Sequence, residues 1–205
     1  MKKSLFAVAA LSLATVGVAC SDSTSQGSGT MVVHLTDAPF STDSVKSVDV
    51  YVVRVDGRQA AADSASAAEG ATDDSAAAGG WTTLAKPNAM YNLLTLQQGV
   101  DTTLGANVIP AGSWSGFRLI IDPSKSSLTL KNGQVLSGST NPGVSFPSGS
   151  RTGIKIVLSA PIVVKADDTT HVEVAFDVGN SFVMRGNSIS QNGLTFKPVI
   201  RATVK

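Results

Sequence analysis

The chain has 205 residues, of which 42% are hydrophobic and 15% are charged, and its 16 Lys and Arg nearly balance its 15 Asp and Glu. This balance argues against a nucleic-acid partner, because proteins that bind nucleic acids gather basic residues to neutralise phosphates. The length suits a single domain with a genuine hydrophobic core.

The first residues have the layout of a secretory signal. Lys2 and Lys3 precede a run of apolar and small residues over positions 5–18. This run is shorter than the ~20 apolar residues that cross a bilayer. Residues 1–19 are therefore predicted to be a signal peptide that is removed on export.

The only cysteine of the chain, Cys20, follows this segment directly. Its position resembles a bacterial lipobox, in which the thiol receives a diacylglycerol, although Gly17 stands where lipoboxes usually carry Leu. Ordinary cleavage after Ala19 is the alternative. Residues 20–29 are small and polar and predict a flexible tether. The expected partner is a membrane reached through the lipid anchor, and the expected location is the cell envelope, with the outer membrane favoured and a periplasmic or secreted protein as the alternative.

Beyond Thr30, apolar and polar residues alternate with the period of strands that have one buried face. In the second predicted strand the apolar phase changes between Val52 and Val53, which predicts a β-bulge. Pro198 within the last predicted strand favours an edge or a bulge there. The predicted strands cover residues 31–36, 47–55, 114–122, 127–130, 153–158, 162–165, 171–177, 181–185 and 195–204.

Turn signals separate these strands. Asp-Gly, Asn-Gly and Pro-Gly pairs begin at Asp56, Asn132, Pro142 and Asn192, and such pairs are typical of hairpin connections. The one helical candidate is a turn or two over residues 93–98. Many short strands with frequent turns predict an all-β fold, an antiparallel β-sandwich with at most one or two helical turns outside the signal peptide.

The stretch from Arg58 to Gly80 consists almost entirely of Ala, Ser, Gly, Asp and Glu. It is predicted to be a disordered insertion at 58–80 within a single domain that spans 30–205, because such a composition cannot form a core. A loop that binds cations or a surface is the alternative reading of its carboxylates.

The sequence lacks the common catalytic motifs. Its two histidines, His34 and His171, both occupy polar-facing positions of predicted strands, and a zinc site needs three or four ligands. The run from Gly112 to Gly116 has Trp114 where a nucleophile elbow has Ser. We therefore expect no metal, no cofactor and no catalytic residue.

Five side chains are candidates for weak binding on residue type alone. Asp37, Asp122 and Asp177 each end a predicted strand, where they either hold calcium or a polar ligand or cap their own turns. Trp81 and Trp114 either offer platforms for sugar rings or pack in the interior.

An ordered series of motifs spans nearly the whole chain from residue 30 to 205. It comprises LTDAP at 35–39, VDVYV at 48–52, Trp81, YNLLTLQQG at 91–99, Leu104-Gly105, IPAG at 109–112, FRLI at 117–120, PSGSRTGIK at 147–155 and FKPVIR at 196–201. The series resembles the domain of unknown function 4382 family, found in bacterial and archaeal exported proteins that are often lipoproteins. The 58–80 insertion departs from the family pattern.

The resemblance implies a β-sandwich of transthyretin-like (prealbumin-like) or carboxypeptidase-regulatory-like type, and it implies no activity. The charged motif positions of the family map to Asp37, Arg118, Lys155, Lys197 and Arg201. They are expected to form a structural network that joins strand ends, or else a ligand site.

The leading functional hypothesis is an envelope-anchored, non-catalytic binding or structural module for a glycan, a cell-wall polymer or an envelope protein. One alternative is a hydrolase that uses aspartates at the strand ends. Another is a periplasmic carrier of an apolar ligand, which would need a cavity lined by inward positions such as Phe117, Leu119, Phe176 and Phe196.

Overall fold

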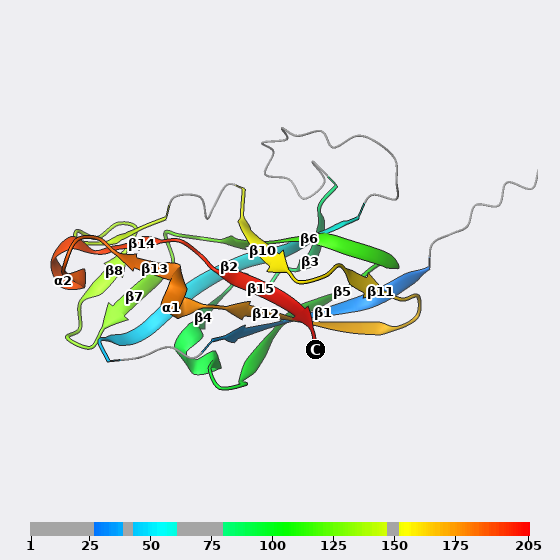
Figure 1. Cartoon of the computed structure of the whole chain (residues 1–205), viewed down its shortest axis with the longest axis horizontal. Coiled ribbons are helices and arrows are strands. Elements are labelled where there is room, and N and C mark those ends of the chain that lie inside the picture. Colours follow the sequence, from blue (N-terminus) through cyan, green and yellow to red (C-terminus); the bar gives the residue numbers. More distant parts are fainter. Residues whose placement is uncertain (1–26, 39–42, 61–79, 147–151) are drawn as a thin grey trace, which may run out of the picture.

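The computed structural model describes residues 27–38, 43–60, 80–146 and 152–205 (Figure 1). The predicted signal peptide, Cys20, most of the predicted tether and most of the predicted insertion lie outside these residues. The first strand begins at Ser28, so the ordered domain starts two residues before the predicted boundary at Thr30.

Strands dominate the described residues, and the helical elements are single turns of four residues each. The strands are β1 (Ser28–Asp37), β2 (Val45–Gln59), β3 (Thr82–Ala85), β4 (Ala89–Asn92), β5 (Asp101–Pro110), β6 (Gly112–Ile121), β7 (Ser127–Leu130), β8 (Val135–Ser137), β9 (Val144–Ser145), β10 (Ile154–Leu158), β11 (Ile162–Val164), β12 (Thr169–Phe176), β13 (Phe182–Met184), β14 (Leu194–Phe196) and β15 (Ile200–Val204). The helical elements are the 3₁₀ turn η1 (Leu93–Leu96) and the α-helices α1 (Val178–Ser181) and α2 (Ile189–Asn192).

Twelve strands form one large sheet with the order β5-β1-β12-β15-β10-β6-β2-β7-β8, to which β11 adds on β6, and β3 and β4 add on β2. A small sheet has the order β13-β14-β9. Three pairs are parallel, namely β1 with β12, β10 with β15 and β14 with β9. The all-β prediction is therefore confirmed, whereas the sheets are mixed rather than purely antiparallel. The transthyretin-like type stays a prediction.

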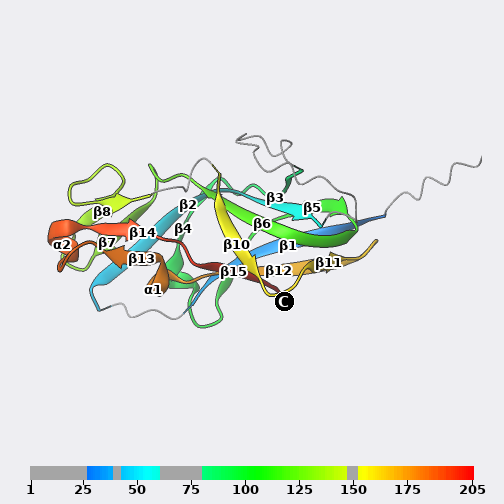
Figure 2. The same ribbon diagram turned by 45° about the horizontal axis from the view of Figure 1, so that its top comes forward.

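The large sheet curls, so that β2 and β6 lie over β1 and β12 in both views (Figures 1 and 2). The alternate apolar positions of these strands meet inside the curl. Val33, Leu119, Val174 and Phe176 are all fully buried there. The polar positions of the same strands face outward, and that outer surface carries the side chains considered below.

The predicted bulge in the second strand is confirmed, because the register of β2 against β6 shifts between Val52 and Arg54. The predicted hairpin turn at Asp56-Gly57 is wrong, since both residues lie inside β2 and are buried. A Cβ atom on Gly57 would come within 2.9 Å of a Leu84 methyl and 3.0 Å of the Trp114 ring. Close packing, rather than a turn, requires glycine at this position.

The last predicted strand, residues 195–204, is two strands. β14 ends at Phe196 and β15 begins at Ile200, and the two belong to different sheets. Pro198 falls between them, where its missing N–H interrupts no ladder. The next amide, Val199 N–H, donates instead to the Ser181 hydroxyl at 2.9 Å.

Other elements differ locally from the sequence prediction. The expected helical turn at 93–98 forms as η1, and α1 precedes β13 where only a strand over 181–185 was predicted. β5 was not predicted, because only two of its ten residues are buried and its alternation is weak. Across the described part of the chain, no helix is both long and apolar enough to span a membrane.

Candidate functional site

A row of polar side chains crosses the outer face of the large sheet. In the strand registers, Arg118 of β6 lies opposite both Asp56 of β2 and Lys155 of β10, and Asp56 lies beside Thr83 of β3. Directly opposite residues on paired antiparallel strands project from the same face. The sheet thus gathers four polar side chains from four strands that are distant in sequence.

Asp56 is the centre of this row and is completely buried. Its Oδ2 atom accepts hydrogen bonds from Arg118 Nε at 2.9 Å and from Arg54 Nε at 3.1 Å, and its Oδ1 atom accepts from the Thr83 hydroxyl at 3.1 Å. Charge-assisted hydrogen bonds of this kind offset the cost of removing a carboxylate from water. Asp56, Arg54 and Arg118 are called the Asp56 cluster below.

Trp81 lies against this cluster on its outer side. Its ring centroid is 4.5 Å from the guanidinium carbon of Arg118 and 5.3 Å from that of Arg58, distances typical of cation–π contacts. Gly116 lies next to the ring, and a Cβ atom there would be 3.5 Å from Trp81 Cη2, an ordinary van der Waals contact. Trp81 is half-buried and Arg58 is exposed, so this pair of side chains is partly open to solvent.

Arg118 retains one unused donor. Its Nη2 atom is the one buried side-chain nitrogen or oxygen without a hydrogen-bond partner among the described residues. A buried donor without an acceptor costs about 1–3 kcal/mol. That atom is enclosed, so the groups that a ligand can reach here are the half-buried Trp81 ring and the exposed guanidinium of Arg58, which makes this surface the strongest binding candidate.

Neither Asp56 nor Arg58 was among the residues singled out from the sequence. Arg54, Asp56 and Arg58 occupy alternate positions of one strand, and this period-two run of charge was the available signal. The Asp56-Gly57 pair concealed it, since the same two residues are typical of a turn.

The chain matches the family model "Domain of unknown function (DUF4382)" over residues 28–198. It belongs to the DUF4382 family. Searches of curated proteins and of solved structures found no significant match. The matched region contains Trp81, Arg118 and the whole Asp56 cluster.

The five charged positions that the DUF4382 resemblance singled out do not form one direct network, although Arg118 and Lys155 lie opposite each other on β6 and β10. Arg118 binds Asp56. Asp37 binds the Gln97 side chain and the Val178 amide. Lys155, Lys197 and Arg201 are exposed. No hydrogen bond or ion pair among the described residues joins any two of the five. The expected network of strand ends is therefore not formed, because the partner of Arg118 is a carboxylate outside that set.

Asp37 is a buried carboxylate at the end of β1. It accepts hydrogen bonds from Gln97 Nε2 at 3.1 Å and from the Val178 amide at 3.2 Å. Burial raises the pKa of Asp37 to about 6, and the nearby Asp177 adds to this, although the hydrogen bonds from Gln97, Val178 and Ala38 act in the opposite direction. No cation is within ion-pair distance among the described residues, which distinguishes Asp37 from Asp56.

The other two aspartates cap turns. Asp122 accepts from the amide and hydroxyl of Ser124, at 3.0 and 2.5 Å, and pairs with Lys125 at 3.3 Å. The Ser124 hydroxyl is the largest of the causes that lower the pKa of Asp122. Asp177 is the N-cap of α1 and accepts from the Asn180 amide at 3.0 Å. The capping oxygens of both residues are thus engaged locally.

Trp114 is 1% exposed, and its indole N–H donates to the Pro110 carbonyl at 3.3 Å. It packs in the core and offers no ring face to a ligand. Of the two tryptophans, only Trp81 is placed to contact one.

Proposed function

We propose that this chain is an exported, envelope-anchored and non-catalytic module that binds an acidic glycan or cell-wall polymer. The observation that carries the proposal is the half-buried Trp81 ring, with the guanidinium groups of Arg58 and Arg118 both within cation–π distance of it. Sugar rings stack on aromatic faces, and guanidinium groups form paired hydrogen bonds with carboxylate and phosphate. A polymer that has both sugar rings and acidic groups would contact both the Trp81 ring and the guanidinium groups.

The charges around Trp81 favour an anionic ligand over a neutral one. Lys155 is exposed and lies opposite Arg118 in the strand register, while the single carboxylate of the row, Asp56, is buried and already engaged. Among the described residues, the exposed charges of this row and of the Trp81 contact are Lys155 and Arg58, both positive. This charge favours an acidic polymer.

The contacts of the aspartates support a role without catalysis. General acid–base hydrolysis uses two carboxylates aimed at one substrate. Asp122 and Asp177 accept hydrogen bonds from their own turns, and Asp37 is enclosed by Gln97 and Val178. A carrier function finds no comparable support, because Phe117, Leu119, Phe176 and Phe196, proposed as cavity-lining residues, are each at most 2% exposed within one continuous core.

The location rests on the first twenty residues. A basic start, a short apolar segment and a single cysteine after Ala19 support export followed by lipidation of Cys20. Metabolic labelling with an alkyne fatty acid in a bacterial host tests this, and we expect label on the full chain and none on Cys20→Ser. Equal labelling of the two would overturn the lipid anchor and leave the binding proposal untouched.

Binding is tested by titrating the purified mature chain, carrying Cys20→Ser, with polygalacturonate and with uncharged dextran of similar length. We expect tryptophan fluorescence and calorimetry to show binding of the acidic polymer alone. Trp81→Ala should weaken it at least tenfold, and Arg58→Ala severalfold. Arg201→Ala, which removes an exposed arginine from β15, is the matched control and should bind normally. Unchanged binding by Trp81→Ala, or a preference for dextran, would overturn the proposal.

A further inference from the structure

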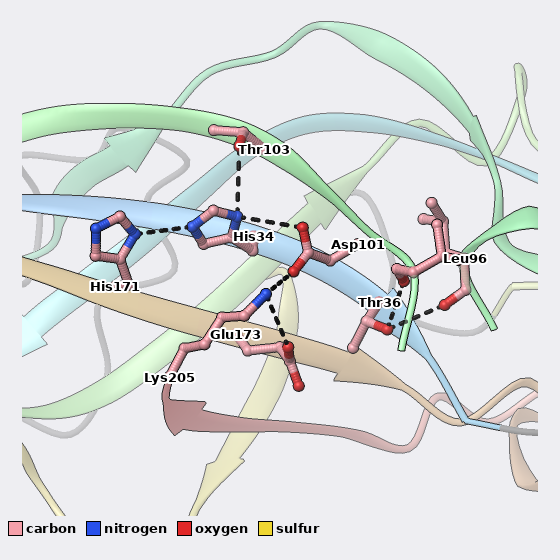
Figure 3. Close-up of polar contacts among 9 residues, drawn as sticks. His34, Thr36, Leu96, Asp101, Thr103, His171, Glu173 and Lys205 are labelled. Carbon is pink, nitrogen blue, oxygen red and sulfur yellow. Dashed lines mark hydrogen bonds and ion pairs between the residues drawn. The ribbon is translucent and has the colours of Figure 1, made fainter. Parts of the chain in front are cut away.

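The two histidines of the chain lie side by side on the outer face of the large sheet (Figure 3). His34 belongs to β1 and His171 to β12, which pair in parallel. His34 Nε2 is 3.0 Å from His171 Nδ1, and the ring centroids are 5.3 Å apart with planes 26° from parallel. Residues 137 positions apart in sequence thus point ring nitrogens at each other.

The second ring nitrogen of His34 faces oxygen atoms. His34 Nδ1 is 3.6 Å from a carboxylate oxygen of Asp101 and 3.4 Å from the Thr103 hydroxyl, both on β5 (Figure 3). A carboxylate on this side favours the tautomer with hydrogen on Nδ1. Nε2 then carries the lone pair, and it is the atom that faces His171.

We propose that His34 and His171 form a binding site for a divalent transition-metal ion, copper(II) above all, and that Asp101 orients His34 for it. Metal–imidazole bonds are about 2.0–2.1 Å long, so two nitrogens bound at a right angle are about 2.9 Å apart. The observed separation of 3.0 Å meets this requirement without separating the strands. The hydrogen of His171 moves from Nδ1 to Nε2, and both rings turn so that the lone pairs of His34 Nε2 and His171 Nδ1 converge on the ion instead of lying along the line between the two nitrogens.

The choice of metal follows from the ligands. Imidazole nitrogens suit copper, nickel and zinc, and copper(II) binds most tightly among divalent ions of the first transition row. The described residues contain no group of three or more His, Cys, Asp or Glu side chains that could hold a metal ion together. The ion therefore keeps water at its remaining positions, and its affinity is lower than that of a site with three or four protein ligands.

The surroundings keep His34 available. Burial lowers the pKa of His34, Lys205 and His171 lower it further, and Glu173 opposes them. His171 is exposed, so an ion reaches the pair directly from solvent. This site shares no residue with the Trp81 surface, so copper binding is tested independently of polymer binding.

The test uses the full chain carrying Cys20→Ser and no polyhistidine tag, titrated with copper(II) chloride by calorimetry at pH 7.5, because a free thiol would itself bind and reduce copper(II). We expect one copper ion per chain at the pair, with imidazole nitrogen couplings in its electron paramagnetic resonance spectrum. His34→Gln and His171→Gln should each weaken binding at least tenfold, and Asp101→Asn should weaken it about tenfold. Nickel(II) and zinc(II) should bind the same pair more weakly.

Thr169→Gln is the matched control, because Thr169 is exposed on β12 two residues before His171 and projects from the same face. It should bind copper as the unaltered chain does. Circular dichroism establishes whether each variant is folded. If His34→Gln does not fold, His171→Gln, which alters an exposed residue, still tests the proposal. Copper affinity unchanged in His171→Gln, or a spectrum without imidazole nitrogen, would overturn the proposal.

Discussion

Two polar clusters occupy the outer face of the same sheet and differ in their access to water. The Asp56 cluster has a carboxylate side chain that is 0% exposed and an Arg118 side chain that is 8% exposed. In the second cluster, formed by His34, His171, Asp101 and Lys205, the Lys205 side chain is 47% exposed. The first cluster has exchanged its hydration for fixed partners, whereas the second still shares its partners with solvent.

This difference indicates which groups of the surface stabilise the fold and which are available for binding. Buried charges are costly unless every partner is in place, so removing one partner is strongly destabilising. Exposed ion pairs contribute little to folding, and the same exposure leaves their atoms free to take up an ion. The first three predictions below concern the buried groups and the last concerns the exposed cluster.

Asp56→Ala should produce the largest effect, because it leaves Arg118 buried without its carboxylate partner. We expect the free energy of unfolding to fall by about 3–5 kcal/mol. Asp101→Ala, the matching change in the exposed cluster, should lower it by less than about 1 kcal/mol. Urea unfolding at pH 7 measures both, and similar losses in the two variants would remove the distinction between the clusters.

Asp37 extends the comparison, because it is buried like Asp56 but has no cation within ion-pair distance among the described residues. Its pKa is about 6 in the folded chain, above the ordinary value of 3.8. The folded protein therefore holds a proton that the unfolded chain releases, and the free energy of unfolding should fall as the pH rises from about 4 to about 6.

Asp37→Asn removes this proton release and should raise stability at pH 7 by about 3 kcal/mol relative to the unaltered chain, with a much smaller difference at pH 4. Urea unfolding between pH 4 and pH 8 measures the difference. Asp122→Asn is the control, because the pKa of Asp122 is lowered rather than raised. A difference that grows towards acid pH for Asp37→Asn would show that the carboxylate is ionised in the folded state.

Trp81→Ala tests how far the aromatic ring shields the Asp56 cluster. Loss of the contacts with Arg118 and Arg58 should lower the free energy of unfolding by about 1–2 kcal/mol. Trp81→Phe keeps an aromatic face and should lose less. Thermal unfolding measures both variants, and an equal loss in the two would show that an aromatic face at this position is not what stabilises the cluster.

Lys205→Ala should produce the smallest effect. Lys205 pairs with Asp101 and, at 3.8 Å, with Glu173, and it is half exposed. We expect a loss below about 1 kcal/mol that vanishes in 1 M salt, where the screening length is about 3 Å. Urea unfolding at low and high salt measures it. A loss that persists at high salt would show that the ion pairs of Lys205 are shielded from solvent, as those of the Asp56 cluster are.

Much of the strand pattern was predictable, because a strand with one buried face repeats its apolar residues locally. The alternation along β12, the phase change at Val52 and the helical turn before Gly99 all depend on neighbours in sequence. β5 was missed for the same reason. Only two of its ten residues are buried, and an exposed edge strand places little constraint on its residues.

The candidate site was only partly predictable. Trp81 and Arg118 were selected by residue type and by the motif series, but Asp56 was assigned to a turn. Asp-Gly in a hairpin and Asp-Gly inside a strand are identical over a short window, and the partner that decides between them, Arg118, is 62 residues away. The histidine pair was equally unpredictable, because the strands that carry its members, β1 and β12, are far apart in sequence and become neighbours only in the folded sheet.

The sequence by itself determined that the chain is an all-β member of its family, where most strands run and which side of each strand is polar. These properties follow from the period of the pleat and from ordered motifs. Only the tertiary structure decided which strands are neighbours, and therefore that Asp56 is buried against Arg118 while His34 meets His171 at the surface. Charge and hydrogen bonding act through space, and the distances that govern them exist only once the sheet has curled.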